Sequence, residues 1–156
     1  MARLIPNENT WVGFALAVAD VSAPTEAEVT GATPLTDFVI TIDASSAGNQ
    51  LPTPNLASLF ETSISGTVQA TFTGEFYRDD DDDTAYTTLP RATDGFFLIS
   101  RFGTAGAVPA ATDVIEVWPI RVTSRTDTPL TSNDVLRFSI QAAVIAEPDE
   151  GATVAA

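Results

Sequence analysis

The sequence predicts a mainly β protein, built as an antiparallel β-sandwich or barrel with one or two short helices. Apolar and polar residues alternate with a period of two along most of the chain, which is typical of strands with one buried and one solvent-facing side. Turn-rich segments separate these runs, and only two short segments carry helix signals. The length of 156 residues predicts a single domain, residues 1–156, that can bury a core of its own.

Six strands are expected in chain order, at residues 12–18, 38–42, 67–77, 96–102, 114–123 and 136–144. The alternation is clearest in the third run, whose apolar face carries Val68, Ala70, Phe72 and Phe76. The fourth and fifth runs are apolar on both faces, which predicts central or covered strands. Pro119 interrupts the fifth run, and because proline cannot donate to the ladder, it predicts an edge or a bulge there.

Two short helices are expected. Thr25 and Glu28 have the spacing of a capping box, which predicts a helix over residues 25–30. The second helix should follow an acidic run and begin at an aspartate cap, Asp82 or Asp83. Negative charges at a helix N-terminus are stabilised by the helix dipole. The run is therefore interpreted as helix-capping, and it comprises Asp79, Asp80, Asp81, Asp82 and Asp83.

The acidic run also admits two other interpretations. Five carboxylates could bind calcium, although the ligand spacing, the turn glycine and the distal glutamate of an EF-hand loop are missing. The run could instead form an electronegative surface. These alternatives remain open at the level of the sequence.

Composition excludes several classes of function. Without cysteine or histidine the chain has no thiol nucleophile, no Ser-His-Asp triad and no zinc site built from these residues. The net charge of −14 disfavours binding to nucleic acid, which is also negatively charged. The longest apolar run, residues 11–19, is about half of the ~20 residues that a membrane helix needs. No catalytic residue, cofactor or metal site is expected, and a glycosidase built on Glu75, Asp94 and Glu116 is the weaker alternative.

An interaction surface fits the composition better than an active site. Residues 1–10 and 147–156 lack periodicity and are expected to be arms, and residues 44–57 are expected to form a long polar loop. Such segments can become ordered when a partner supplies buried area. The loop residues proposed for this role are Ser45, Ser46, Gly48, Asn49, Gln50, Leu51, Pro52, Pro54, Asn55 and Leu56.

Five stretches of the chain carry a resemblance to a known family. They read VGFALAVADVSAPTEAEVTGATPLTDF, PTPNLASLFETSISGT, FYRDDDDDTAYTTLPRATDGFFLISRFG, VIEVWPIRVTSRT and EPDEGATVAA. In this order they resemble the major tail tube protein of phages with long, non-contractile tails, of the kind that infects actinobacteria. The resemblance spans nearly the whole chain and contains no catalytic signature.

The resemblance implies a β-sandwich of the tail-tube type and a structural role in the virion tail. Six copies would form a ring, and the rings would stack into a hollow tube. This assembly would take place in the host cytoplasm. The loop at 44–57 and the two arms would contact neighbouring subunits and rings. The implied partners are further copies of the chain, a tape measure protein, a tail terminator and a distal tail protein.

DNA would pass through the lumen of such a tube without specific binding, because an acidic wall repels phosphates. The candidate lumen carboxylates are those on the polar faces of expected strands, namely Asp37, Asp43 and Glu75. Two alternatives remain at this point. The chain could be a tail terminator or connector that makes a single ring, or a monomeric β-sandwich binding module.

Overall fold

The computed structural model describes residues 9–54, 56, 62–103 and 106–156 of the chain. The elements in chain order are β1 (Trp11–Ala15), α2 (Glu26–Thr30), β2 (Thr33–Pro34), β3 (Val39–Thr53), β4 (Thr62–Tyr77), α3 (Thr84–Thr88), β5 (Asp94–Ser100), β6 (Val114–Asp127), β7 (Arg137–Val144) and β8 (Asp149–Thr153). The mainly β, antiparallel fold with two short helices is confirmed.

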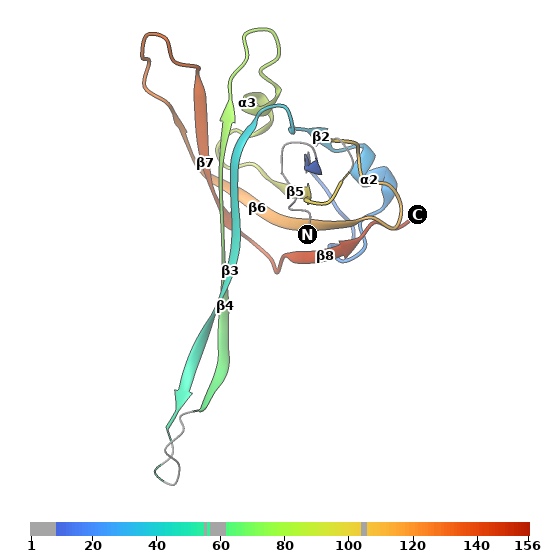
Figure 1. Ribbon diagram of the computed structural model, residues 1–156, viewed down its shortest axis with the longest axis vertical. Helices are drawn as coiled ribbons and strands as arrows, with labels where there is room; N and C mark the ends of the chain where they lie inside the picture. Colours follow the sequence, from blue (N-terminus) through green and yellow to red (C-terminus); the bar gives the residue numbers. More distant parts are fainter. Residues whose placement is uncertain (1–8, 55, 57–61, 104–105) are drawn as a thin grey trace, which may run out of the picture.

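The strands form one antiparallel sheet that β6 divides into two layers. The order is β2-β1-β5-β6-β7-β4-β3, and β8 also pairs with β6. On one edge of β6 lies β5, while the opposite edge pairs first with β8 and then with β7. Figure 1 shows the result: β3, β4 and β7 form an upright layer, and β6 crosses from it into the layer of β1, β5 and β8.

The main core lies between these layers and is rich in aromatic rings. Phe72 of β4 stacks on Phe97 of β5 with 4.6 Å between the ring centroids. Phe76 stacks on Phe138 of β7 at 5.3 Å, and Trp118 of β6 closes the cluster. A second core, built on Trp11, Val29, Ile115, Val117, Leu98 and Val154, holds α2 and the C-terminal segment against the sheet.

Pro119 lies in a central strand and pairs with β5 without a register shift, so the prediction of an edge or a bulge there was wrong. It sits opposite Phe96 of β5, and its carbonyl accepts a hydrogen bond from Ile145 N–H at 3.0 Å on the other edge of β6. Because the N and O atoms of an extended residue point to the same side, the missing N–H faces the gap where β7 ends and β8 has not begun. The proline therefore costs the β5–β6 ladder no hydrogen bond.

All six expected strands are present, but two expected irregular segments are regular. The polar loop expected at 44–57 continues β3 as far as Thr53, because β4 supplies backbone partners as far as the pair of Thr53 and Thr62. The C-terminal arm expected at 147–156 contains β8, which pairs with β6 and buries Ala152 and Val154. The N-terminal arm falls almost wholly outside the described residues.

The two ends of the upright layer differ in shape. The far part of the β3–β4 hairpin projects from the body as a two-stranded ribbon, at the lower end of Figure 1. At the upper end lie α3, the acidic run and the connection between β6 and β7. This elongated layer sets the geometry of the candidate site.

Candidate assembly surface

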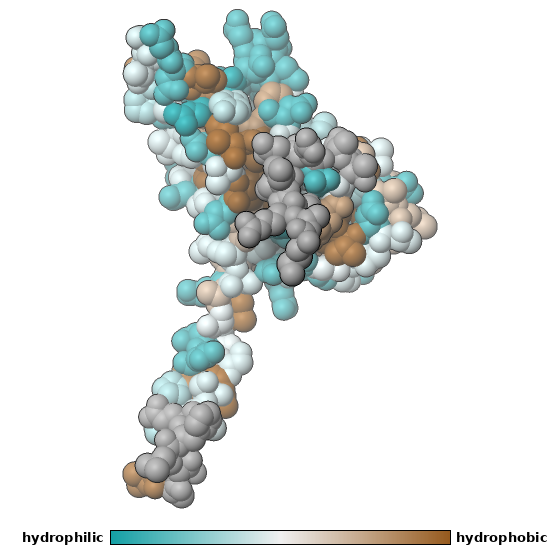
Figure 2. Space-filling model, viewed as in Figure 1, coloured by the Kyte–Doolittle hydropathy of each residue, from teal (hydrophilic) through white to brown (hydrophobic). Residues whose placement is uncertain are grey.

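The projecting ribbon is two-faced. We call residues 44–53 of β3 and 62–70 of β4 the distal hairpin. Leu51 is paired with Ile64, so one face of the ribbon carries an apolar pair. Val68 is paired with Gly48 beyond a register shift and lies on the opposite face. The side chains of Leu51, Ile64 and Val68 are 48%, 56% and 64% exposed. Figure 2 shows apolar residues along this otherwise polar ribbon, with no second layer of the body over the ribbon.

The distal hairpin is also uncharged. Glu61 is the single charged residue in positions 44–70 of the sequence, although the chain as a whole carries a net charge of −14. Residues 62–70 add serine, threonine, glutamine and small apolar residues. A surface of this kind can approach another acidic subunit without bringing like charges together.

Most of the loop residues expected at an interface lie on this ribbon. Seven of them belong to β3, namely Ser45, Ser46, Gly48, Asn49, Gln50, Leu51 and Pro52. Pro54 and Leu56 follow the strand, and the Leu56 side chain is fully exposed. Asn55 lies outside the described residues. The structure thus brings most of these residues together on one projection.

The outer edge of β3 is a second assembly feature. β3 is 15 residues long and stands last in the sheet order, and no described strand pairs with the edge that faces away from β4. A long unpaired edge exposes backbone N–H and C=O groups and is a template for another strand. Pro52, near the end of β3, is the one residue of this strand without a backbone N–H.

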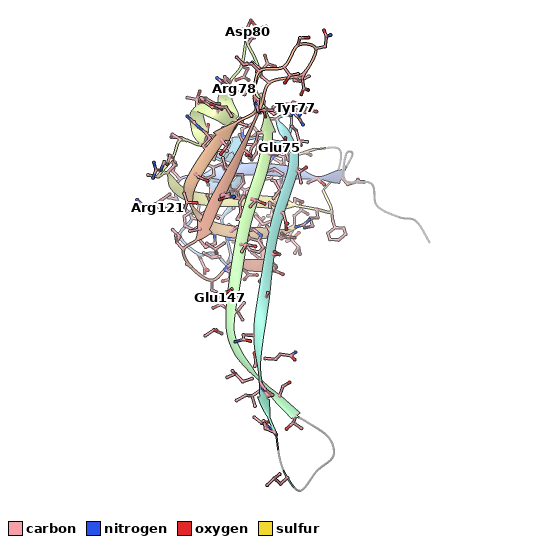
Figure 3. All side chains as sticks on the ribbon, turned by 90° about the vertical axis from the view of Figure 1, so that its left-hand side faces the viewer. Glu75, Tyr77, Arg78, Asp80, Arg121 and Glu147 are labelled. Atoms are coloured by element: carbon pink, nitrogen blue, oxygen red, sulfur yellow. The ribbon has the colours of Figure 1, made fainter. Side chains whose placement is uncertain are left out.

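The solvent-facing side of the upright layer carries small polar groups and balanced charges. Asp43 and Glu75 lie on this face, on neighbouring strands. Glu75 pairs with Arg137 of β7 at 3.3 Å, and Arg121 of β6 lies 3.6 Å from Asp94. Figure 3 is turned toward this layer and labels Glu75 and Arg121. Asp37, the third candidate lumen residue, precedes β3 at the upper end of the sheet.

The acidic run does not cap α3 through a side chain, so that part of the prediction was wrong. Asp83 is the N-cap residue, but its side chain makes no capping hydrogen bond. Arg78 takes the carboxylate instead, at 2.5 Å between Nη2 and Oδ2. This hydrogen bond is the main reason that the pKa of Arg78 lies above its ordinary value. Asp79 and Asp82 form local turns with Asp81 N–H and the Thr84 hydroxyl.

A tyrosine between two arginines holds α3 on the sheet. The guanidinium carbons of Arg78 and Arg125 lie 3.6 and 3.7 Å from the centroid of the Tyr86 ring. Arg125 also donates to the Tyr86 carbonyl at 2.9 Å, and the ring meets Phe138 edge-on at 5.2 Å. We call Arg78, Tyr86 and Arg125 the arginine clamp, because they fix the acidic end of the layer.

The capping box of α2 is confirmed. Thr25 accepts from Glu28 N–H, and the Glu28 carboxylate accepts from Thr25 N–H at 2.8 Å and from Ala19 N–H at 2.8 Å. These two backbone hydrogen bonds lower the pKa of Glu28. Hydrogen bonds from Ser22 likewise lower the pKa of Asp20 in the preceding turn. The network ties α2 to the segment that follows β1.

Nothing in the described part of the chain forms a recognisable reactive centre. Across those residues, no group of three or more histidine, cysteine or acidic side chains has the arrangement of a metal site. The carboxylates considered for a glycosidase each face a separate arginine, Glu75 with Arg137, Asp94 with Arg121 and Glu116 with Arg101. No helix in the described ranges is long and apolar enough to cross a membrane.

A match to a protein-family model identifies the family of this chain. The model described as phage tail tube protein matches residues 1–156. The chain belongs to this family. Phage tail tube proteins are structural proteins of the tail and not a family of enzymes. The likeness expected from the sequence is therefore confirmed at the level of the phage tail tube protein family.

Solved structures with this tail tube fold come from several assembled particles. A chain in the extended-state sheath/tube terminator structure of the PVC extracellular contractile injection system aligns with a TM-score of 0.66 and 11% identity, over 96% of this chain and 97% of that one. A chain in the tail of an empty gene transfer agent particle, refined with C6 symmetry, gives 0.57 and 13% over 97% and 100%. A chain in the native gene transfer agent virion gives 0.56 and 11% over 95% and 98%.

At these identities the alignments show a shared fold. No curated protein matches the chain. The matched structures are parts of assembled tails and injection systems.

Two features of this tail tube protein escaped the sequence analysis. The exposed pair Leu51 and Ile64 was missed because the sequence assigned these residues to a loop and its flank, and a register shift separates them from the regular alternation of residues 67–77. β8 was hidden because only Ala152 and Val154 alternate there. Both segments contain few apolar residues, so the periodicity of apolar positions is a weak signal for each.

Proposed function

We propose that this tail tube protein forms sixfold rings that stack into the hollow tail of a phage with a long, non-contractile tail, and that DNA is delivered through the lumen. The observation that carries the proposal is the distal hairpin, which exposes Leu51, Ile64 and Val68 and includes the distal part of the free edge of β3. An isolated two-stranded ribbon is marginally stable in water, so a second layer from another subunit supports it.

Assembly would use both features. The free edge of β3 would pair with a strand of a neighbouring subunit and remove the exposed backbone groups. The distal hairpin would reach into the adjacent ring and bury Leu51, Ile64 and Val68. The C-terminal segment would contribute to contacts only through the faces that β8 leaves exposed.

The lumen wall in this proposal is the solvent-facing side of the upright layer. It would present hydroxyl groups together with Asp43 and the ion-paired Glu75. The net charge of −14 per subunit sets a repulsive field around the wall, so DNA would slide without specific binding. The proposed partners are a tape measure protein, a tail terminator and a distal tail protein, with assembly in the host cytoplasm.

Electron microscopy of the purified protein at high concentration, and of virions, tests the proposal. We expect stacked rings whose end-on averages have sixfold symmetry. Rings that never stack would assign the chain to the terminators or connectors, the alternative suggested by the fold shared with the terminator structure. A protein that stays monomeric and is missing from the virion tail would overturn the structural role altogether.

A further inference from the structure

Two arginines lie on the solvent-facing side of the upright layer, the side proposed to line the lumen. Arg137 lies on β7, and Arg121, which Figure 3 labels, lies on β6. Their neighbours along the strands, Phe138 and Ile120, face the core, so both arginines point to the open side. A guanidinium stays charged and binds phosphate through two parallel hydrogen bonds. An accessible arginine on this side would therefore hold passing DNA.

Each of these arginines faces a carboxylate of the same subunit. The Arg137 Nη1 atom lies 3.3 Å from Glu75 Oε1, and its Nη2 atom lies 3.3 Å from Asp134 Oδ2. The third nitrogen of this guanidinium, Nε, is buried. The Arg121 Nε atom lies 3.6 Å from Asp94 Oδ1, and Asp94 is directly opposite Arg121 in the β5–β6 ladder. We call Glu75, Asp94 and Asp134 the neutralising carboxylates, because they balance both cations within the subunit.

We propose that the neutralising carboxylates keep Arg121 and Arg137 from binding the phosphates of DNA that passes through the tube. This inference rests on the proposed tube-forming function and gives these carboxylates a role distinct from general repulsion. Removing one of them would lower the negative charge of the wall and would also uncover a cation. A DNA phosphate would then take the place of the missing carboxylate on the guanidinium.

The surroundings of Arg137 provide no substitute for its two carboxylates. Among the described residues, only Glu75 and Asp134 lie within ion-pair distance of this guanidinium. The hollow beside Glu75 is lined by uncharged polar side chains, namely Thr41, Thr73, Ser139 and Gln141. Without its two partners, Arg137 would therefore be a cation on a wall of hydroxyl and amide groups, open to a phosphate from the lumen.

Repetition makes one accessible arginine per subunit important. In the proposed tube the same residue recurs in every subunit of every ring, and double-stranded DNA carries one phosphate charge per ~1.7 Å of its axis. Contacts that are weak one at a time would then act together along the DNA. The ion pairs themselves contribute little to folding, because all of these side chains are partly exposed. Substitution should therefore affect DNA binding more than stability.

Co-sedimentation of DNA with assembled tubes tests the inference. Glu75→Gln combined with Asp134→Asn removes both partners of Arg137. Tubes would be formed in the presence of short linear double-stranded DNA and then pelleted. At low salt we expect at least about tenfold more DNA in the pellet than with unmodified tubes, because each freed guanidinium gains a charge-assisted hydrogen bond. The bound DNA should be released as the salt concentration rises.

The matched control removes the same number of carboxylates without freeing an arginine. Asp43→Asn combined with Asp80→Asn does so, because neither aspartate is ion-paired with an arginine in the described part of the chain. Tubes of this control should retain no more DNA than unmodified tubes. Adding Arg137→Gln to the variant that lacks Glu75 and Asp134 should abolish the gain in bound DNA.

A second variant gives an independent measurement on other strands. Asp94→Ser, on β5, frees Arg121 on β6. The two side chains are 56% and 54% exposed, so the melting temperature of the free subunit should hardly change. We expect a gain in bound DNA with these tubes as well, and adding Arg121→Gln should remove it.

The outcomes separate this inference from the proposed function. Tubes that form normally but retain no extra DNA in either freed variant would overturn the inference alone, as would equal retention by the charge-matched control. Closed circular DNA has no end to thread into a tube, so freed variants that bind it as well as linear DNA would carry these arginines outside the lumen and contradict the proposed wall. Failure of the unmodified protein to form tubes would remove the proposed function itself.

Discussion

The two halves of β4 show how one pattern can have two outcomes. In the body, Phe72 and Phe76 are 1% and 0% exposed, and in the distal hairpin, Val68 and Ile64 are 64% and 56% exposed. Val68 lies on the face of Phe72, whereas Ile64 follows a register shift and lies on the other face. Both halves carry apolar residues. What changes is the second layer, since β1 and β5 cover the body half and no described element covers the other.

This difference separates folding from assembly. The body half of β4 contributes to a core that the chain completes alone, so its apolar residues stabilise the free subunit. Leu51, Ile64 and Val68 of the distal hairpin are largely exposed in the free subunit, so they contribute little until another subunit covers them. The predictions below test this division.

The largest effect is expected from paired substitutions on β4. Phe72→Ala should lower the free energy of unfolding of the free subunit by about 3–5 kcal/mol, because it leaves a cavity beside Phe97 and Trp118. Ile64→Ala, in the distal half of the same strand, should change it by no more than about 0.5 kcal/mol. Urea denaturation at concentrations below assembly measures both.

The comparison fails if Ile64→Ala destabilises the free subunit as much as the core substitution does. That result would mean that the body itself covers the distal hairpin. A small effect on the subunit combined with loss of tubes would instead place Ile64 at a subunit interface.

An intermediate effect is expected at the arginine clamp. Tyr86→Leu keeps an apolar side chain near Phe138 but removes the ring between Arg78 and Arg125. We expect a loss of about 1–2 kcal/mol in unfolding free energy, because two cation–π contacts disappear. The matched change in the distal hairpin is Thr53→Ala, which removes a hydrogen bond of 2.8 Å to the Thr62 carbonyl. The melting temperature of the free subunit should hardly change with Thr53→Ala. Equal losses of stability from Tyr86→Leu and Thr53→Ala would contradict the separation of folding from assembly.

The smallest effect is expected from the pH dependence of α2. Hydrogen bonds from Thr25 and Ala19 lower the pKa of Glu28 from 4.5, so its stabilising contribution is present above that pH and is lost as the pH falls through the folded-state pKa. Glu28→Gln should therefore flatten the acid side of the stability profile. Chemical denaturation at a series of pH values below about 5 measures this effect. If the unfolding free energy varies with pH equally in the variant and the unmodified protein, Glu28 does not contribute to the acid sensitivity.

Features that depend only on residues close together in the sequence could be predicted from the sequence. The alternation of residues 67–77 and the Thr25–Glu28 pair specify a strand and a helix start through neighbours in the chain, and both are confirmed. The family resemblance came from the ordered set of such segments and is confirmed for the tail tube family. The absence of histidine and cysteine likewise excluded whole classes of chemistry before any fold was known.

Other features depended on partners that are distant in the sequence. The sequence predicted a cap for α3 at Asp82 or Asp83, but Arg78 captures Asp83 because the end of β4 brings the guanidinium beside it. It predicted an arm at 147–156, but β6 offers an edge to β8 where β7 has ended. A carboxylate or a strand edge binds whatever the fold brings near it, so spacing along the chain does not specify the partner.

The sequence by itself determined where the strands run, which of their faces are apolar and that the chain is a phage tail tube protein. Only the tertiary structure decided which of those faces the subunit covers for itself. Alternation depends on the geometry of a single strand, whereas coverage requires a second layer packed on it. For Phe72 that layer comes from β5, and for Ile64 it must come from another copy in the proposed tube.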